Sequence, residues 1–257
     1  MKARRLNRIL ITGASGGLGA ALARHYATHG RTLLLWGRDH ERLQATAAAC
    51  RAAGANVAVR SLDLSDSAAA IAALEADDQD AIDLALLAAG AGDIRAPEDL
   101  VEDATQVARI GMINFVATSA MAAALARRMA QRRQGRIVLI GSVAAFHALP
   151  FATGYAGSKA GLTHFAHALR IGVKRHGVIV TLVSPGFIDT AAGRRSPGPK
   201  PFILQPADAA ARIARAAGRG QAHAIFPWPF VVLRWIDRLL PMALRDRLLL
   251  GLNPPGG

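Results

Sequence analysis

Short apolar runs alternate with longer helical stretches along most of the chain. The runs are largely apolar throughout, and the stretches between them are rich in Ala and Leu. The runs span residues 8–12, 32–36, 56–62, 83–89, 136–142, 178–184 and 223–227. Strands that are apolar on both sides indicate a parallel sheet that helices cover on both faces. The alternation therefore predicts a doubly wound α/β fold with a mostly parallel sheet of seven strands.

Gly and Pro cluster in one segment that interrupts the alternation. This segment, residues 185–201, follows the sixth run and reads PGFIDTAAGRRSPGPKP. Such a composition predicts a mobile loop. We assign residues 191–206 to a loop that covers the substrate.

Residues 228–257 form an apolar C-terminal extension, in which Pro241 separates two expected short helices. On a helical wheel from Phe230 to Leu240, three charged residues share one narrow face and apolar residues fill the rest. One interpretation packs the extension over a substrate pocket or on a partner subunit. The other is a peripheral membrane contact with the arginines at the headgroups, namely Arg234, Arg238, Arg245 and Arg247.

Length and composition predict a single domain over residues 1–257, because 52% of the residues are apolar and can fill one large core. The net charge of +13, from 31 basic and 18 acidic side chains, fits a polyanion, an anionic membrane or an anionic cofactor. The chain has neither basic runs interleaved with aromatics nor zinc-finger spacing, so we predict no nucleic-acid partner.

Cysteine usage and the first residues predict a cytoplasmic protein. Cys50 is the only cysteine, so no intrachain disulfide can form. The chain runs from a basic start into the first strand without a cleavable apolar segment. The uncharged run 137–158 could cross a bilayer by length, but Gly, Pro and polar residues interrupt it. The histidines show no metal-ligand spacing, so we predict no metal.

A glycine-rich turn, TGASGGLG, directly follows the first strand and precedes a helical run. Gly13, Gly17 and Gly19 let the backbone turn sharply and approach a pyrophosphate, which would sit at the positive end of the helix. Ser15 and Leu18 lie in the same turn and are candidate cofactor contacts. The alternative is a tight turn without a ligand.

The spacing T-G-x-x-x-G-x-G resembles the short-chain dehydrogenase/reductase family. Further motifs in the same order support this resemblance, which covers about residues 7–190. In the family a serine ends the fifth strand thirteen residues before Y-x-x-x-K, and an asparagine lies in the preceding helix. The segment SPGFIDT resembles the family's P-G-x-x-x-T segment after the sixth strand. The matching residues are Asn114, Ser142, Tyr155 and Lys159, then Pro185, Gly186, Ile188 and Thr190.

The resemblance implies a Rossmann fold, an NAD(P)-dependent oxidoreductase and a role for each matched residue. Tyr155 would be the general acid in reduction and the base in oxidation, with its pKa lowered by the ammonium of Lys159 and by oxidised nicotinamide. Lys159 would also hold the nicotinamide ribose, and Ser142 would bind the substrate oxygen. Asn114 would fix a water that relays protons. In the P-G-x-x-x-T segment, Pro185, Gly186 and Ile188 would border the nicotinamide and Thr190 its carboxamide.

The end of the second strand favours NADP (NADPH), with NAD less favoured. Arg38 suits a 2′-phosphate, whereas an NAD enzyme would be expected to place a carboxylate there. Asp39 follows directly and would serve NAD if it turned inward. By resemblance, Asp63 and Leu64 contact the adenine, and Gly90 lets the cofactor pass. The chain reads Leu-Ala-Ala-Gly at 87–90 where the family usually has Asn-Asn-Ala-Gly, so we expect a lost supporting hydrogen bond.

These motifs predict an NADPH-dependent oxidoreductase that interconverts a carbonyl and a secondary alcohol on a small, apolar or lipid-like substrate. The alternative is a catalytically silent NADP-binding regulatory or scaffold protein. The resemblance also implies a homodimer or homotetramer that pairs helices around 100–129 and 156–175. His147 is a candidate substrate contact. For the extension we favour a pocket wall, since hydride transfer needs water excluded, over contact with the inner face of a membrane.

Overall fold

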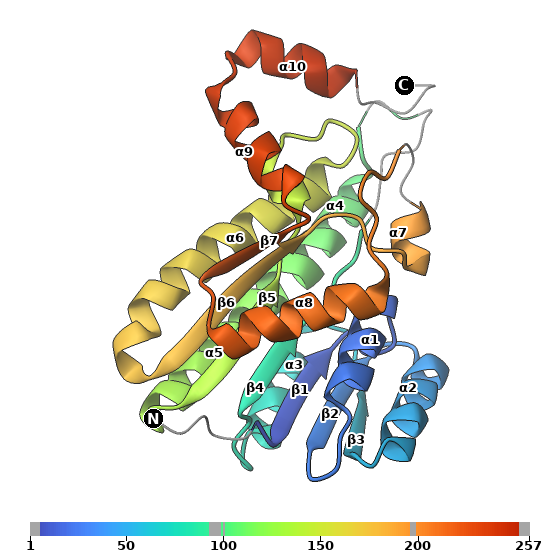
Figure 1. Cartoon of the computed structure of the whole chain (residues 1–257), viewed down its shortest axis with the longest axis vertical. Helices are drawn as coiled ribbons and strands as arrows, with labels where there is room; N and C mark the ends of the chain where they lie inside the picture. Colours follow the sequence, from blue (N-terminus) through green and yellow to red (C-terminus); the bar gives the residue numbers. More distant parts are fainter. Residues whose placement is uncertain (1–5, 93–98, 100, 196–198, 252–257) are drawn as a thin grey trace.

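Seven parallel strands form one sheet at the centre of the molecule (Figure 1). The computed structural model describes residues 6–92, 99, 101–195 and 199–251. The strand order is β3-β2-β1-β4-β5-β6-β7. The strands are β1 (Arg8–Thr12), β2 (Thr32–Gly37), β3 (Asn56–Ser61), β4 (Leu84–Leu87), β5 (Gly135–Ile140), β6 (Val178–Pro185) and β7 (His223–Phe226).

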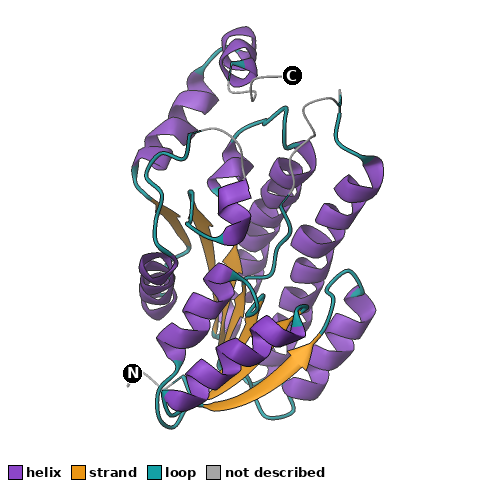
Figure 2. Cartoon of the chain, turned by 90° about the vertical axis from the view of Figure 1, so that its right-hand side faces the viewer, coloured by secondary structure: helices purple, strands orange, loops and turns teal. Residues whose placement is uncertain are grey.

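Helices cover both faces of the sheet, as Figure 2 shows from the side. One apolar core packs the sheet against α1 (Gly17–Tyr26), α2 (His40–Ala52) and α8 (Pro206–Arg219). The other packs it against α3 (Ser67–Asp77), α5 (Thr118–Gln131) and α6 (Thr153–Val173). The predicted doubly wound Rossmann fold is confirmed.

The remaining elements are short or lie at the edges. The π-helical turn η1 (Met112–Ala117) joins α4 (Ala104–Gly111) to α5. The 3-10 turns are η2 (Val143–Phe146) and η3 (Lys174–His176). Helix α7 (Ala191–Arg195) occupies part of the expected loop 191–206, so that loop is partly regular; residues 196–198 lie outside the described part. The extension forms the two expected helices, α9 (Pro229–Leu239) and α10 (Met242–Leu250).

The predicted strands agree with the structure to within two residues, and the largest differences lie at the ends of β4 and β5. The prediction extends to residue 89, whereas β4 ends at Leu87. Ala88 N donates to Leu86 O over 3.0 Å and Ala89 N donates to the Thr12 hydroxyl, so the chain leaves the sheet there. Strand order reverses between β1 and β4, and the carboxyl ends of these two strands mark the expected cofactor crevice.

One helix in the described part, Ala104–Gln131, is long and apolar enough to cross a membrane. It consists of α4, η1 and α5. Its Met121, Leu125 and Met129 are buried against the sheet, so this helix belongs to the core. The uncharged run 137–158 contains most of β5, η2 and the start of α6, as its breaking residues predict.

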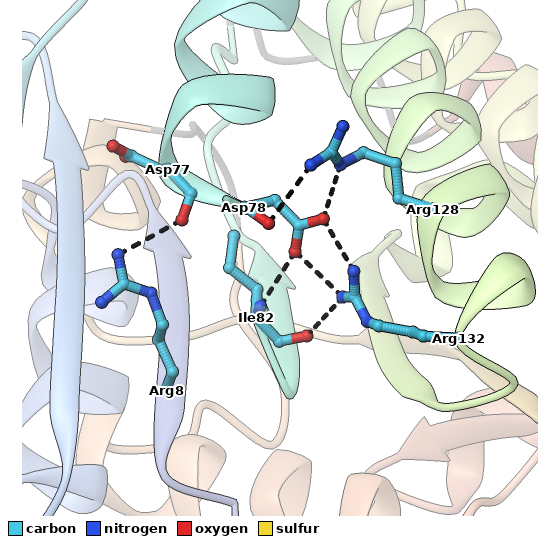
Figure 3. Close-up of polar contacts among 6 residues, drawn as sticks. All are labelled: Arg8, Asp77, Asp78, Ile82, Arg128 and Arg132. Carbon is cyan, nitrogen blue, oxygen red and sulfur yellow. Dashed lines mark hydrogen bonds and ion pairs between the residues drawn. The ribbon is translucent and has the colours of Figure 1, made fainter. Parts of the chain in front are cut away.

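A buried carboxylate joins α3 to α5 at the start of β4 (Figure 3). Asp78 Oδ2 accepts from Arg128 Nε over 2.6 Å and from Arg132 Nη1 over 2.7 Å, and Oδ1 accepts from Ile82 N over 2.8 Å. Burial alone would raise the pKa of Asp78, but the hydrogen bonds from Arg132, Arg128 and Ile82 outweigh burial and lower it. The cluster fixes the entry of the chain into β4.

Replacing Asp78 with Asn should lower the free energy of unfolding by about 3 kcal/mol, because it leaves two arginines without their shared anion. Urea unfolding at neutral pH measures this. Since the pKa of Asp78 is lowered in the fold, its contribution is complete above the ordinary value of 3.8 and is lost as the pH falls through the folded value. The matched control is Asp80→Asn: the Asp80 side chain is 84% exposed, and we expect a change within about 0.5 kcal/mol. Equal effects would contradict the assignment.

Candidate active site

The glycine-rich turn is closely packed against the end of β4. Gly13 has φ +72°, and a Cβ there would lie 2.9 Å from Ala89 Cα. A Cβ on Gly19 would collide with the Gly13 carbonyl. Helix α1 begins at Gly17, so its first amide groups point toward the crevice. Any side chain at 13 or 19 would displace this turn.

Two predicted contacts border the turn. A Cβ on Gly37 would lie 2.6 Å from Ser15 Oγ, which places Ser15 at the end of β2. Leu18 packs against the core on the α1 face. A Cβ on Gly17 would lie 2.6 Å from Thr190 Cγ2, so the segment after β6 reaches back over the start of α1. The glycine turn, the end of β2 and the segment after β6 therefore lie against one another.

Thr12 supports the turn after β4, a role that the sequence analysis missed. Its hydroxyl accepts from Ala89 N over 3.0 Å, and the side chain is 1% exposed. Thr12 is the first residue of the T-G-x-x-x-G-x-G motif, and this was the available signal. The hydrogen bond offsets the support that we expected to be lost with the family's asparagines.

Asn114 holds the next residues of the same turn. Its Oδ1 accepts from Ala91 N and its Nδ2 donates to Ala91 O, each over 2.8 Å. Nδ2 also donates to Ser158 Oγ in α6 over 3.1 Å. A Cβ on Gly90 would lie 3.2 Å from Asn114 Oδ1 and 3.5 Å from Lys159 Nζ. Asn114 therefore positions the turn at Gly90 and ties it to the helix that carries Tyr155 and Lys159.

Tyr155 and Lys159 share one face of α6, as their spacing predicts. Lys159 is 4% exposed, its Nζ donates to Ile140 O over 2.9 Å, and burial lowers its pKa to about 8. Nζ lies 5.9 Å from the centre of the Tyr155 ring. Ser142 Oγ accepts from Ala144 N over 3.1 Å, which orients the hydroxyl at the end of β5.

Tyr155 does not have the lowered pKa that we expected. Burial raises the pKa of Tyr155, and a hydrogen bond with Ser142 only partly offsets it. The expectation relied on positive charge from Lys159 and an oxidised nicotinamide. In the chain alone the ammonium of Lys159 is directed to Ile140 O, so burial dominates.

At the far end of the crevice, Arg38 and Asp39 take different roles. The Arg38 side chain is 63% exposed, and its Nη1 lies 3.8 Å from Asp63 Oδ2. Asp39 caps α2: Oδ1 accepts from Arg42 N over 3.0 Å and Oδ2 from Arg42 Nε over 2.7 Å. Hydrogen bonds from Arg42 lower the pKa of Asp39. Asp39 is therefore held in the cap and does not turn inward.

Asp63 and Leu64 follow β3 beside Arg38. Asp63 Oδ1 accepts from Ser65 N over 2.9 Å, and this hydrogen bond lowers the pKa of Asp63. Leu64 is buried in the core on the α5 face. The structure thus brings the expected adenine contacts to the same sheet edge as the guanidinium.

The segment after β6 meets the extension. Gly186 N donates to Phe226 O over 2.8 Å, and a Cβ on Gly186 would lie 2.5 Å from Phe230 Cε2. Pro185 is the last residue of β6. Ile188 forms a short β-bridge with Leu204. The Thr190 hydroxyl accepts from Gly193 N over 3.0 Å. The phenyl ring of Phe230 thus lies over the residues expected to border the nicotinamide.

His147 contacts the extension. Its Nδ1 lies 3.2 Å from Asp237 Oδ1 in α9, and both side chains are largely buried. His147, the candidate substrate contact, thus uses its Nδ1 to hold α9. Among the described residues, no group of three or more His, Cys, Asp or Glu side chains could hold a metal ion.

The amino-acid sequence of the chain matches known proteins over most of its length. The profile of the family described as short chain dehydrogenase matches residues 7–198. The chain belongs to the short-chain dehydrogenase family. An uncharacterized oxidoreductase of Myxococcus xanthus is 32% identical over 239 residues, which are 92% of this short-chain dehydrogenase and 94% of that protein.

Two solved structures resemble this short-chain dehydrogenase closely. A short-chain dehydrogenase from Sphingobium yanoikuyae in complex with NADPH superposes with a TM-score of 0.79 at 29% identity, over 97% of this chain and 98% of that one. The bulky-bulky ketone specific alcohol dehydrogenase from Comamonas testosteroni gives 0.76 at 25% identity, over 93% and 96%. The protein is therefore an NAD(P)-dependent dehydrogenase/reductase.

Replacing Thr12 with Val should lower the free energy of unfolding by about 1–3 kcal/mol, because Ala89 N loses its buried acceptor. Urea unfolding measures the change, and Thr12→Ser, which keeps the hydroxyl, should recover most of it. Thr181→Val is the matched control: Thr181 is also 1% exposed, and its hydroxyl has no hydrogen-bond partner among the described residues. We expect that change to be neutral or stabilising, and a comparable loss at both sites would contradict the role of Thr12.

Proposed function

We propose that this protein is an NADPH-dependent oxidoreductase that interconverts a carbonyl and a secondary alcohol. The observation that carries the proposal is the arrangement of Tyr155, Lys159 and Ser142 beside the glycine-rich turn. Tyr155 and Lys159 share a face of α6, with Lys159 Nζ 5.9 Å from the centre of the Tyr155 ring, and the Ser142 hydroxyl is near enough to Tyr155 to counteract part of the burial effect on its pKa. A proton donor and an oxygen-binding group thus meet at the carboxyl edge of the sheet, where the cofactor crevice lies.

The residues present fit a dinucleotide. Side chains at Gly13, Gly17 or Gly19 would fill the turn where a pyrophosphate approaches, and a side chain at Gly90 would press on Asn114 and Lys159. When bound, the nicotinamide supplies the hydride in reduction and accepts it in oxidation. The phosphates would be held by the glycine-rich turn, namely Gly13, Ser15, Gly17, Leu18 and Gly19. Lys159 would hold the ribose hydroxyls.

Tyr155 then moves the proton. In reduction its hydroxyl gives a proton to the carbonyl oxygen as that oxygen gains negative charge, and in oxidation the phenolate takes the proton back. The Ser142 hydroxyl, oriented by Ala144 N, donates to the same oxygen. Because burial raises the pKa of Tyr155, the hydroxyl keeps its proton at neutral pH, which suits the reductive direction.

Asn114 takes a positioning role in this scheme. Its amide oxygen and nitrogen are engaged by Ala91 and Ser158, so it fixes the turn at Gly90 relative to α6. The proton-relay water expected at Asn114 stays a prediction.

The cofactor preference rests on Arg38. It is the exposed cation at the end of β2, while the nearest carboxylate in sequence, Asp39, caps α2. A 2′-phosphate would find a guanidinium there, whereas a 2′-hydroxyl would find no acceptor at Arg38. The related structure from Sphingobium yanoikuyae is a complex with NADPH. We therefore propose NADPH, with NAD less favoured.

An apolar substrate suits the pocket wall. The Phe230 ring lies 6.4 Å from that of Phe187 and 6.3 Å from that of Phe202, centre to centre, beside Gly186. Such an aromatic wall excludes water and binds hydrocarbon groups. The related enzyme from Comamonas testosteroni is named for bulky ketones, which supports a carbonyl compound with large apolar substituents.

A catalytically silent NADP-binding protein is the alternative. It is disfavoured because Asn114, Ser142, Tyr155 and Lys159 are all present and lie together. The cytoplasmic location and a homodimer or homotetramer paired through helices around 100–129 and 156–175 stay predictions. Cell fractionation tests the location, and a strictly monomeric mass in solution would contradict the assembly.

Replacing Tyr155 with Phe should reduce turnover roughly 100-fold or more and leave NADPH affinity within a few-fold, because only the proton donor is removed. NADPH absorbance with a panel of ketones and aldehydes measures turnover, and fluorescence titration measures binding. The control is Tyr26→Phe, which alters the chain's other tyrosine, a buried residue of α1. Retained turnover in Tyr155→Phe would contradict the proposal, and tight NADPH binding without turnover of any compound would favour the silent protein.

Replacing Arg38 with Glu should shift the preference toward NADH, because the carboxylate accepts from a ribose hydroxyl and repels a 2′-phosphate. The ratio of the two dissociation constants measures the shift. Arg51→Glu makes the same charge change in the last turn of α2, away from the crevice, and should leave the ratio unchanged. If the unaltered protein binds NADH as tightly as NADPH, the assignment of Arg38 is wrong.

A further inference from the structure

Two charged residues of helix α9 face the protein. Asp237 lies beside His147, the Arg234 guanidinium lies 4.7 Å from the centre of the Phe146 ring, and Phe230 covers Gly186. These three residues of α9 are spaced by four and then three positions, so they form one face of the helix. Arg234 and Asp237, which would face water on an ordinary surface helix, therefore make internal contacts.

The opposite face of α9 and most of α10 are apolar and exposed. In Figures 1 and 2 the two helices project beyond the sheet and its helical layers. No other described element packs extensively against α10. Six large apolar side chains here are more than half exposed, and we call them the tail surface: Trp228, Trp235, Leu239, Met242, Leu248 and Leu250. An exposed apolar group of this size marks a site of interaction.

Charge identifies the partner that fits this surface. Residues 228–251 contain four arginines and two aspartates, which gives 4 − 2 = +2, and the whole chain carries +13. Arg247 is exposed between the leucines of α10, whereas Arg245 is partly buried and its Nε lies 3.7 Å from Asp246 Oδ1. A second copy with two-fold symmetry would bring these like charges together, since each patch would face itself. An anionic lipid surface accepts both the arginines and the apolar side chains.

The aromatic residues point to the same partner. The indole rings of Trp228 and Trp235 are largely exposed, and tryptophan favours the boundary between headgroups and hydrocarbon. We propose that the tail surface docks on an anionic lipid bilayer, with α9 and α10 lying in the interface. Of the four arginines expected at the headgroups, Arg234 packs its guanidinium against Phe146, and the side chain of Arg238 lies outside the described part. We assign the headgroup role to the exposed Arg247. The pocket wall stays a prediction: Phe230 contacts Gly186 on the inner side of α9, and the outward face of this helix is exposed.

Vesicle co-sedimentation of the full chain tests the proposal. The probes are vesicles of phosphatidylglycerol and phosphatidylcholine in equal parts, and vesicles of phosphatidylcholine alone. We expect binding to the anionic vesicles at about 0.1 M salt and much weaker binding at about 1 M, where the screening length falls to about 3 Å. No binding of the unaltered protein to anionic vesicles would overturn the proposal.

Two matched pairs of variants separate the apolar and charged contributions. Leu239→Ser should weaken binding about tenfold, whereas Leu239→Met, which stays apolar, should not. Arg247→Gln should weaken binding to anionic vesicles about fivefold, whereas Arg219→Gln in α8, the same change at another exposed site, should leave it near the unaltered value. Equal loss in Arg247→Gln and Arg219→Gln would mean general attraction by net charge and would overturn a specific tail surface.

A mass measurement without lipid and a kinetic assay identify the other occupants. A protein that fails to bind vesicles and loses a subunit on Leu239→Ser uses the tail surface to bind a second copy. A protein that fails to bind vesicles and loses kcat/KM for a small soluble ketone on the same change uses it as a lid. Either result overturns the lipid proposal, and neither depends on the assignment of Tyr155.

Discussion

The geometry of the site depends on hydrogen bonds that hold the chain where it leaves β4. The strand order reverses between β1 and β4, and the backbone beyond Leu87 leaves the ladders that β4 forms with β1 and β5. Thr12 from β1 and Asn114 from the π-helical turn supply the missing partners, one to Ala89 and one to Ala91. Asn114 then reaches Ser158 in α6. The turn at Gly90, the glycine-rich turn and the helix with Tyr155 are thereby fixed relative to one another.

The fold could be predicted from the sequence because buried parallel strands are apolar throughout and glycine motifs mark the crossings between strand and helix. The four-residue spacing of Tyr155 and Lys159 also predicted that these side chains share one helix face. The end of β4 could not be predicted, since Ala88 and Ala89 are as apolar as the strand and leave it only through local hydrogen bonds. The orientation of α9 was equally hidden, because a helical wheel gives the faces of a helix but does not say which one contacts the protein.

The electrostatics of the site come from burial more than from neighbouring charge. Burial lowers the pKa of Lys159 to about 8 and raises that of Tyr155, so both groups are less readily charged than in water. The sequence places the two residues one turn apart but does not reveal how deeply each is buried. Asp78 shows the opposite balance, because two arginines and an amide stabilise its charge and lower its pKa despite burial. Burial and polar partners thus act in both places, but they favour the charged form of Asp78 and the neutral forms of Tyr155 and Lys159.

The contact between Gly186 and Phe230 constrains how this enzyme can vary. A Cβ at position 186 would lie 2.5 Å from the Phe230 ring, so glycine is required there by the helix that follows β7 as well as by any cofactor. Residues 186 and 230 are in contact although more than forty residues separate them in the sequence. If a small residue replaced Phe230, alanine or serine at position 186 would no longer collide with α9. Substitutions at these two positions should therefore occur together in evolution, and each should be deleterious when it arises without the other.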